Sequence, residues 1–559
     1  MKVYFRIIGL SALAACAASA QPVVSAALNN ASYALPGQTN SGIARGSLFA
    51  VFGTGLATSN LTATAFPLSA NMGGTSVRVT VGTTSVDALM IYTTAGQIGA
   101  MLPSNTPEGA GSLVASLNGQ ASRPLAITVV RSAFGIFTAN QQGSGPGSIQ
   151  IANSATDQPT VALNRPARPG QTMILWGTGL GPTTASEAAG PVPGDLAGVN
   201  VQVYVGGRLA TVSYKGRSGC CASIDQIAFV VPDGVEGCYV PVVVRTGDVV
   251  SNFASIAVAR TGNTCSDVNG LSGQDILTAQ ANGNSRTGNI SLIRSKSKFS
   301  VEGFTLESNT DSGFGYFSRY DLGQLLTAQG TGGNTFTVSL GACSVATYKA
   351  STDPGVGFVD PVKPTILDAG PQITIIGPNG TKQLLKRGEL YTAELGGGTS
   401  GLPGVPGVPA ATPLYLEPGS YKINNGSGGT GANAVGAFSV DFTLPQQVTW
   451  TNDTAVDSVT RSSGQQITWS GGSADSIVQI IGFSTTKDSS SVFNCTERAS
   501  VGRFTIPSYV LLLLPPTTAD NIGFLAVGGS SATQRFTAPG LDSGYVSASS
   551  LNQKTVTYR

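Results

Sequence analysis

The stretch that decides the fold occurs twice, as GSLFAVFGTGL at residues 46–56 and as GQTMILWGTGL at residues 170–180, an offset of 124 residues. Each copy is an apolar run of strand length that ends in Gly-Thr-Gly-Leu. The apolar run predicts a buried β-strand, the glycines permit a tight turn through positive φ, and the leucine returns to the core. A phosphate-binding glycine loop would need a helix directly after it, and neither 57–70 nor 181–195 has helical periodicity. We therefore interpret the repeat as structural.

The repeat continues beyond this stretch in both copies. Valine alternates with other residues at 77–81 and again at 199–205, which predicts half-buried strands. Asn118-Gly119 is the signal for a two-residue hairpin turn. Short strands with frequent turns are typical of β-sandwiches. We predict two immunoglobulin-like sandwiches, at 21–138 and at 139–265, the second including a preceding linker or long loop at 139–159.

Several segments of this repeat resemble known families. The apolar strand, the Gly-x-Gly turn and the Val203–Gly207 hairpin resemble IPT/TIG immunoglobulin-like domains. Residues 26–260 are more closely similar to the Solibacter-type uncharacterised C-terminal domain family of secreted acidobacterial proteins. That resemblance implies export and an immunoglobulin-like fold, and it supplies no catalytic residue because the family has no established activity. The segments that carry it are Asn30-Ala31-Ser32-Tyr33, Val51-Phe52-Gly53-Thr54-Gly55-Leu56, Gln97-Ile98-Gly99-Ala100, Gly135-Ile136-Phe137-Thr138 and Asp225-Gln226-Ile227.

Composition excludes several functions. The 559 residues include no histidine, so a Ser-His-Asp triad, a Cys-His dyad and a histidine-ligated zinc site are all excluded. Charged residues are only 11% of the chain, and 31 Lys and Arg nearly balance 29 Asp and Glu. Such a chain does not provide the basic surface that nucleic-acid binding needs. No motif indicates a cofactor, and we predict none.

The N-terminus has the pattern of an export signal. Lys2 and Arg6 precede an apolar run at 7–18, and Ala18-Ser19-Ala20 is a small-x-small cleavage site. This predicts a signal peptide at 1–20 and a secreted protein. Leu13-Ala14-Ala15-Cys16 also fits a bacterial lipobox, in which Cys16 would be lipidated and would anchor the protein at the cell surface. The apolar run at 7–18 is too short to span a membrane, and no later apolar run reaches the spanning length.

The remaining cysteines agree with export to an oxidising compartment. None has the CxxC spacing of a zinc or redox site. A bridge between the adjacent Cys220 and Cys221 needs a strained ring, so we expect one of them to pair with Cys238 and the other with Cys265. Cys343 and Cys495 are then expected to pair with each other. The disulfide candidates are Cys220, Cys221, Cys238, Cys265, Cys343 and Cys495.

The second half of the chain predicts further β-rich modules. Ser272-Gly273-Gln274-Asp275 fits a capping box and predicts a helix at 273–282. Asp267 begins a sequence like a calcium loop, but three defining positions do not match, so we interpret it as a turn. The predicted class is all-β, with tandem sandwiches and one or two short helices in the middle region. The predicted modules are a β-rich region at 266–360, a β module at 361–445 and a C-terminal sandwich at 446–559.

Tryptophans and a proline-rich stretch offer two further interpretations. Phe52 and Trp176 occupy the same place in the repeat and are expected to be equivalent and buried. Trp450 and Trp469 lie in alternating strands, where filling a core is favoured over stacking on a sugar. Three collagen-like triplets at 401–409 are too few for a triple helix and predict an extended loop.

Three functions are open on the sequence alone. The first is a non-catalytic exported protein for adhesion, matrix building or ligand display, with an extracellular protein or a polysaccharide as partner. The second is a carbohydrate-binding array, for which the least core-like aromatic residues are Tyr316, Phe317 and Tyr320. The third is an enzyme that uses paired carboxylates of the glycosidase kind. Its carboxylate candidates are Asp267 with Asp275 and Glu302 with Glu307.

Overall fold

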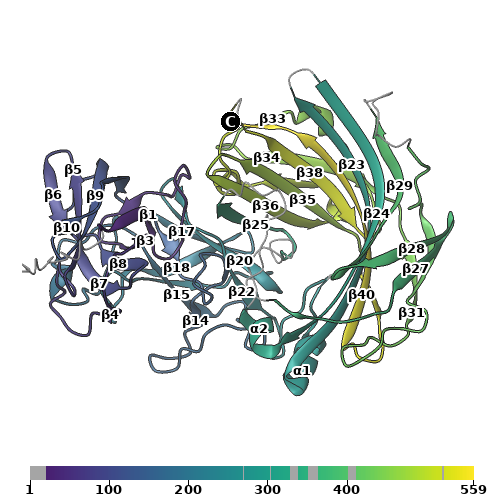
Figure 1. The fold of residues 1–559 in the computed structure, drawn as a ribbon, viewed down its shortest axis with the longest axis horizontal. Helices are drawn as coiled ribbons and strands as arrows, with labels where there is room; N and C mark the ends of the chain where they lie inside the picture. The colour runs from purple at the N-terminus through teal and green to yellow at the C-terminus, as the bar shows by residue number, and fades with distance from the viewer. Residues whose placement is uncertain are drawn as a thin grey trace, which may run out of the picture.

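The computed structural model describes residues 21–268, 270–301, 304–327, 338–349, 363–400, 411–518 and 521–559. The chain forms two β-sandwiches followed by a larger β-structure, which lie in this order along the longest axis of the molecule (Figure 1). The all-β class is therefore confirmed. Within these residues, no helix has the length and apolar character needed to cross a membrane. The predicted signal peptide, Cys16, Glu302 and the triplets at 401–409 lie outside the described residues.

The first sandwich has two layers, and its strands pair antiparallel except for one parallel pair in the second layer. One layer has the order β1 (Val23–Asn29), β3 (Leu48–Thr54), β8 (Gln97–Met101), β7 (Leu89–Thr93), β4 (Leu61–Thr62). The other has the order β2 (Ile43–Ala44), β11 (Leu125–Val130), β9 (Gly109–Leu117), β5 (Thr75–Val81), β6 (Thr84–Asp87), and β10 (Gln120–Ala121) also pairs with β9. The alternation predicted at 77–81 is confirmed, because Val77 and Val79 are fully buried and Arg78 is exposed. Asn118 and Gly119 have positive φ and join β9 to β10, as predicted.

The second sandwich repeats the packing of the first. Phe49 and Val51 of β3 belong to the first core, and the equivalent Met173 and Leu175 belong to the second. Its strands follow the order β12 (Gly135–Ile136), β15 (Thr172–Thr178), β19 (Asp225–Val230), β18 (Arg208–Arg217), β17 (Val201–Val205), β20 (Gly237–Thr246), β22 (Ala254–Val258), β13 (Gly145–Pro146). Three short strands pair beside this path: β14 (Ile149–Ile151), β16 (Gly194–Asp195) and β21 (Val249–Val250).

The Gly-Thr-Gly-Leu turns behave as predicted. Gly55 and Gly179 both have positive φ, and Leu56 and Leu180 are buried in the two cores. No α-helix follows either turn; the second is followed by a single 3-10 turn, η1 (Glu187–Ala189). The prediction for the aromatic pair is half wrong. Phe52 and Trp176 are equivalent, but both are only half-buried because they lie on the outward face of their strands.

The rest of the chain is built around one long sheet rather than three separate modules. Its order is β25 (Ala342–Lys349), β36 (Ser489–Arg498), β35 (Ile477–Thr485), β38 (Gly523–Ser530), β40 (Ser543–Thr555), β23 (Asn284–Val301), β24 (Phe304–Asp321), β29 (Leu390–Ser400), β28 (Gly380–Arg387), β27 (Gln372–Gly377), β30 (Gly419–Asn424), β31 (Ser439–Leu444). Two short strands, β26 (Thr365–Ile366) and β39 (Gln534–Phe536), pair beside it. The boundaries predicted at 360 and 445 therefore do not separate sheets, because strands far apart in sequence pair directly, as β23 does with β40.

Smaller elements complete this part and connect it to the second sandwich. A three-stranded sheet packs on the long sheet and shares a hydrophobic core with it; its order is β32 (Val448–Trp450), β34 (Gln465–Gly471), β37 (Arg503–Ile506). A separate two-stranded sheet pairs β33 (Ser458–Val459) with β41 (Thr557–Tyr558). Trp450 and Trp469 are buried in that core, as predicted. Tyr204 of the second sandwich stacks on Tyr509 of this part, with ring centroids 4.6 Å apart.

Three α-helices occur among the described residues, α1 (Gly273–Asn282), α2 (Leu322–Thr327) and α3 (Ser508–Leu511). The prediction for α1 is confirmed in detail. Ser272 and Asp275 form a reciprocal capping box, and Gly283 ends the helix with a φ of 69°. Ile276 packs into the core of the second sandwich, so the helix is held by its apolar face as well as by its cap.

The predicted boundary between the two sandwiches also needs correction. β12 lies within the predicted first sandwich but pairs with β15 of the second. The predicted linker at 139–159 contains β13 and β14, which pair with β22 and β15. The segment is rich in glycine and serine, but its two isoleucines, Ile149 and Ile151, are buried and anchor it.

Candidate functional site

A groove of about 810 Å³ lies at the seam between the first two sandwiches. Its walls come from the segment after β1, from the outward faces of β3, β7 and β8, and from the segment after β12. Phe52 projects into this groove because it alternates with the core residue Val51 along β3. The groove is lined by Asn30, Ala31, Tyr33, Phe52, Tyr92, Gln97, Phe137, Thr138, Ala139, Gln141 and Ser148.

Four aromatic rings supply the apolar part of the groove. Tyr33, Phe52, Tyr92 and Phe137 are all half-buried, so each ring keeps part of its surface open. The rings of Tyr33 and Phe52 lie 6.1 Å apart, tilted by 59°. Rings that are fixed by a sandwich and partly open to solvent can stack on the apolar face of a ligand ring.

The polar part of the groove is a chain of uncharged groups. Gln97 Nε2 donates to Tyr92 Oη at 2.8 Å, and Tyr92 Oη donates to Asn30 Oδ1 at 3.0 Å. Burial raises the pKa of Tyr92 to about 12, so its hydroxyl stays protonated at neutral pH. None of the residues that line the groove is Asp, Glu, Lys or Arg. The groove therefore offers stacking surfaces and neutral hydrogen-bonding groups.

Two non-glycine residues in the groove have positive φ. Tyr33 has a φ of 51° and Gln141 a φ of 57°, a region that side chains other than glycine seldom adopt. Each is held by nearby hydrogen bonds, Tyr33 N to Asn29 O at 3.0 Å and Gln141 N to Thr138 O at 3.0 Å. The backbone at both positions is therefore held by hydrogen bonds within the chain itself.

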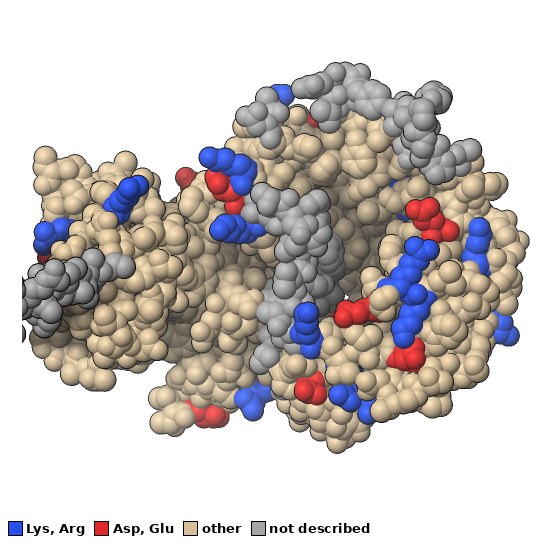
Figure 2. All heavy atoms as spheres, in the orientation of Figure 1, with Lys and Arg blue, Asp and Glu red and all other residues tan. Residues whose placement is uncertain are grey.

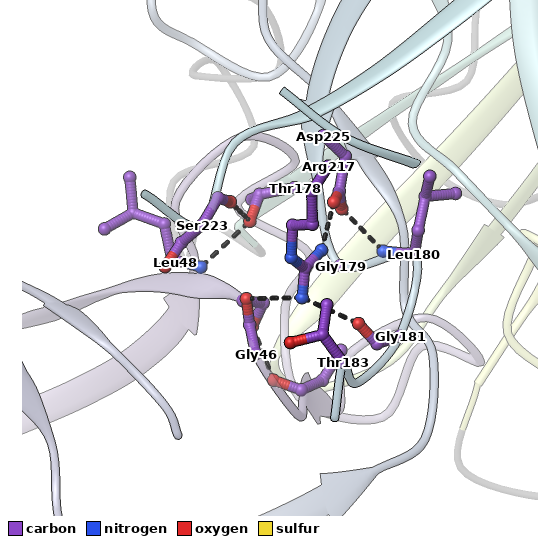
Figure 3. Close-up of polar contacts among 12 residues, drawn as sticks. Gly46, Leu48, Thr178, Gly179, Leu180, Gly181, Thr183, Arg217, Ser223 and Asp225 are labelled. Atoms are coloured by element: carbon purple, nitrogen blue, oxygen red, sulfur yellow. Dashed lines mark hydrogen bonds and ion pairs between the residues drawn. The ribbon is translucent and has the colours of Figure 1, made fainter. Parts of the chain in front are cut away.

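A buried ion-pair network fixes the two sandwiches relative to each other at this seam (Figure 3). Arg217 at the end of β18 pairs with Asp225 and, at 2.8 Å, with Glu187, and all three side chains are almost completely buried. Arg217 also donates to the carbonyls of Gly181, at 2.7 Å, and of Gly46 in the first sandwich, at 3.0 Å. Burial alone would lower the pKa of Arg217, but the two carboxylates raise it above its ordinary value.

Further bonds across the seam extend this network. Thr178 Oγ1 donates to Ser223 O at 2.7 Å and accepts from Leu48 N of the first sandwich at 2.9 Å. Asn29 Nδ2 reaches from the first sandwich to the carbonyls of Ala133 and Thr178, at 3.0 and 3.2 Å. The groove thus lies between two bodies that are joined by specific hydrogen bonds rather than by a loose linker.

The structure does not bring the predicted stacking residues Tyr316, Phe317 and Tyr320 together. They lie on β24, a regular strand, so Phe317 points to the opposite face from the two tyrosines. Phe317 is fully buried and contacts Tyr391 edge-on, with centroids 5.6 Å apart. Phe317 is therefore a core residue, and its proposed stacking role is wrong. Tyr316 and Tyr320 are half-buried, and a role for them stays a prediction.

All six candidate cysteines are paired in the structure. Cys343 and Cys495 pair as expected, since they face each other in the β25–β36 register. The other pairing is wrong: Cys220 pairs with Cys221, and Cys238 with Cys265. The reason is that the chain after β22 brings Cys265 to the start of β20, with a Cα–Cα distance of 5.0 Å. The adjacent pair projects from the β18–β19 hairpin loop instead.

The carboxylate candidates that the structure describes make structural contacts. Asp275 caps α1 and also accepts from Arg535 and from Tyr545 Oη, the latter at 2.8 Å. Burial opposes ionisation, but these hydrogen bonds lower its pKa to about 2. Glu307 pairs with Lys298 across the β23–β24 hairpin at 3.4 Å. Within the described residues, no group of three Cys, Asp or Glu side chains could hold a metal ion.

Asp267 is expected to make the stability of the folded protein depend on pH. Its Oδ1 accepts from Cys238 N at 2.8 Å, its buried Oδ2 has no hydrogen-bond partner, and burial raises its pKa to about 6. Because an unfolded aspartate has a pKa of about 3.9, the folded state holds the proton more tightly, and stability falls as pH rises from about 4 to about 6. We expect a higher Tm at pH 5 than at pH 7, by differential scanning calorimetry.

The control for this prediction is Asp267→Asn, which cannot titrate and should lose the difference in Tm between pH 5 and pH 7. Histidine does not contribute to this window because the chain has none, and Asp275 titrates well below it. The buried Asp225 also has a raised pKa, and the Asp267→Asn variant separates its contribution because it leaves Asp225 unchanged. An unchanged pH dependence in Asp267→Asn would show that another group is responsible.

Most groove residues lie in segments that carry the family resemblance, but nothing in the sequence alone marks them as one site. Asn30, Tyr33, Phe52, Gln97 and Phe137 all occur in the segments that carry the family resemblance. One feature of the sequence could have indicated the groove: these segments hold aromatic and amide residues outside the alternating core positions. Their convergence on one groove depends on how two sandwiches pack, which no local pattern specifies.

The fold is that of a multi-domain all-β protein with an uncharged groove at the seam between its first two sandwiches. No protein-family model and no curated protein matches the chain. Among solved structures, the titin Ig tandem A164–A165 is 8% identical, with 39% of this chain and 90% of that chain covered and a TM-score of 0.12. A Bacteroides ovatus mixed-linkage glucan utilization locus protein, SGBP-B, solved with a mixed-linkage heptasaccharide, is 10% identical, with 87% and 98% covered and a TM-score of 0.13.

A third similarity is to the γ-CGTase of alkalophilic Bacillus clarkii, at 10% identity and a TM-score of 0.14. It covers 49% of this chain and 34% of that one, so the match spans about a third of the enzyme. TM-scores this low do not establish a shared fold, and they transfer no function.

Proposed function

We propose that this protein is an exported, non-catalytic binding protein for surface adhesion or ligand display, and that it holds a neutral polysaccharide in the groove between its first two sandwiches. The observation that carries this proposal is the lining of the groove, which combines four open aromatic rings with amide and hydroxyl groups and has no charged side chain. Sugar rings present apolar faces for stacking and hydroxyls for neutral hydrogen bonds, so the lining matches this class of ligand.

The lining of the groove does not suit hydrolysis of a glycosidic bond. Hydrolysis of a glycosidic bond needs a pair of carboxyl groups on either side of the bond. The groove has none, and Asp225 and Asp275 are engaged in structural ion pairs elsewhere. The three disulfides and the predicted N-terminal signal support export. The resemblance to secreted acidobacterial proteins also supports export. Four of the five segments that carry this resemblance contribute residues to the groove.

Charge on the surface supports a neutral partner. Figure 2 shows blue and red groups scattered over a mostly uncharged face, with opposite signs often side by side. No continuous basic surface is visible on this face, so nucleic acid is not a candidate partner there.

The test is binding of neutral and charged polysaccharides to the purified chain, measured by affinity electrophoresis and isothermal titration calorimetry. Phe52→Ala and Phe137→Ala should each weaken binding of a neutral polysaccharide about tenfold, because each removes one stacking ring worth roughly 1–1.5 kcal/mol. Phe314→Ala is the matched control, since Phe314 is an exposed aromatic residue, 41% accessible, on β24.

Equal losses in Phe52→Ala and Phe314→Ala would contradict the groove as the binding site. Binding of charged polysaccharides alone would contradict the neutral ligand.

A further inference from the structure

Two adjacent cysteines stand apart from the other four in their exposure. Cys220 and Cys221 lie in the hairpin loop at 218–224, and both are exposed. The four cysteines of the other two disulfides are no more than 3% accessible. A thiol in solution can therefore reach the Cys220–Cys221 bridge and not the others.

The ends of this loop are clamped, so the bridge is not needed to hold it in place. Arg217 and Asp225 face each other in the register of β18 and β19 and form a buried ion pair. Ser218 N also donates to Ile224 O at 2.9 Å. A disulfide stabilises a fold mainly by closing a loop of intervening residues, and adjacent cysteines close none. The bridge therefore contributes little to stability, which points to a chemical use.

A serine hydroxyl makes the two sulfurs chemically different. Ser218 Oγ lies 3.0 Å from Cys220 Sγ and accepts from Cys220 N, also at 3.0 Å. A disulfide sulfur has no proton to donate, so the hydroxyl donates to Cys220 Sγ. The same hydrogen bond would stabilise a thiolate on Cys220, and a disulfide opens faster when the leaving sulfur is the better stabilised thiolate. Cys220 is therefore the leaving group and Cys221 the sulfur that is attacked.

We propose that the Cys220–Cys221 bridge is a site of thiol–disulfide exchange with low-molecular-weight thiols, and that the thiol becomes attached to Cys221. The attacking thiolate forms a new S–S bond to Cys221 Sγ as the Cys220–Cys221 bond breaks. The electron pair of the broken bond leaves with Cys220 as a thiolate, which takes a proton from water. One disulfide is consumed and one mixed disulfide is formed, so no external oxidant is needed. This modification site is independent of the ligand groove.

The test uses the full native chain with glutathione as the thiol. Samples are quenched over time with excess N-ethylmaleimide, which caps the freed Cys220 before it can attack the mixed disulfide, and are then mapped by peptide mass spectrometry. The expected product carries one glutathione on Cys221 and one maleimide on Cys220, with the other two disulfides intact. Glutathione on Cys220, an equal mixture, or no reaction at this bridge would overturn the proposal.

A serine series tests the role of Ser218. Ser218→Ala should slow adduct formation roughly tenfold, the effect expected for one hydrogen bond to a developing charge. Ser218→Thr keeps a hydroxyl and should restore the rate. Ser223→Ala is the matched control, because Ser223 is in the same loop and its buried Oγ has no hydrogen-bond partner. Equal rates in Ser218→Ala and Ser223→Ala would overturn the assignment, and circular dichroism confirms that each variant is folded.

Discussion

Arg217→Met is expected to lower the free energy of unfolding of the first two sandwiches by about 3–5 kcal/mol, measured by urea denaturation followed by fluorescence. Methionine fills a similar volume but leaves Asp225 and Glu187 without their counter-ion, and both carboxyl groups are buried. It also leaves the carbonyls of Gly46 and Gly181 without the donor that joins the two sandwiches. The cost comes from these stranded groups and not from the loss of the pair itself.

Two further variants separate this cause from a general effect of losing an arginine. Arg78→Met removes an exposed arginine that pairs with Asp87 at 2.7 Å, and it should leave the unfolding midpoint nearly unchanged. The triple variant Arg217→Met, Glu187→Gln, Asp225→Asn removes the stranded charges and should recover part of the lost stability. A triple variant less stable than Arg217→Met, or an Arg78→Met variant equally damaged, would contradict this account.

The sequence predicted the parts of the fold that depend on short-range patterns. The repeat at 46–56 and 170–180 correctly places Phe49 with Met173 and Val51 with Leu175 in equivalent core positions. The capping box of α1 was also predictable, because Ser272 and Asp275 interact within one turn. In each case, the physical cause lies within a few residues of its effect.

The errors arose where distant segments decide the outcome. Phe52 was expected in the core because β3 is apolar on both faces, yet only packing between sandwiches shows that one of these faces borders a groove. The three modules predicted after residue 265 share one sheet, because β23 pairs in parallel with β40 more than 240 residues later. Arg217 and Glu187 carried no motif, and their ion pair forms only at the seam.

Removal of the Cys343–Cys495 disulfide is expected to have the largest effect of the three bridges. The bridge closes a loop with a sequence separation of 152, for which chain entropy predicts about 5 kcal/mol of stabilisation. β25 is the first strand in the order of the long sheet and pairs with β36, so the bridge also secures an edge strand. Its sulfurs lie in a core that includes Val243 and Phe253 of the second sandwich.

Double substitutions to alanine at each bridge, compared by denaturant unfolding, make this expectation quantitative. Loss of Cys343–Cys495 should cost about 5 kcal/mol, and loss of Cys238–Cys265, with a separation of 27, about 3.5 kcal/mol. Loss of Cys220–Cys221 should cost least, because the two residues are adjacent and no loop is closed. This order follows from loop length alone, whereas a stabilisation that came from local packing at the sulfurs would affect the two buried bridges alike. Equal losses at Cys343–Cys495 and Cys238–Cys265 would therefore show that packing, and not the constraint on the unfolded chain, is the main contribution of these disulfides.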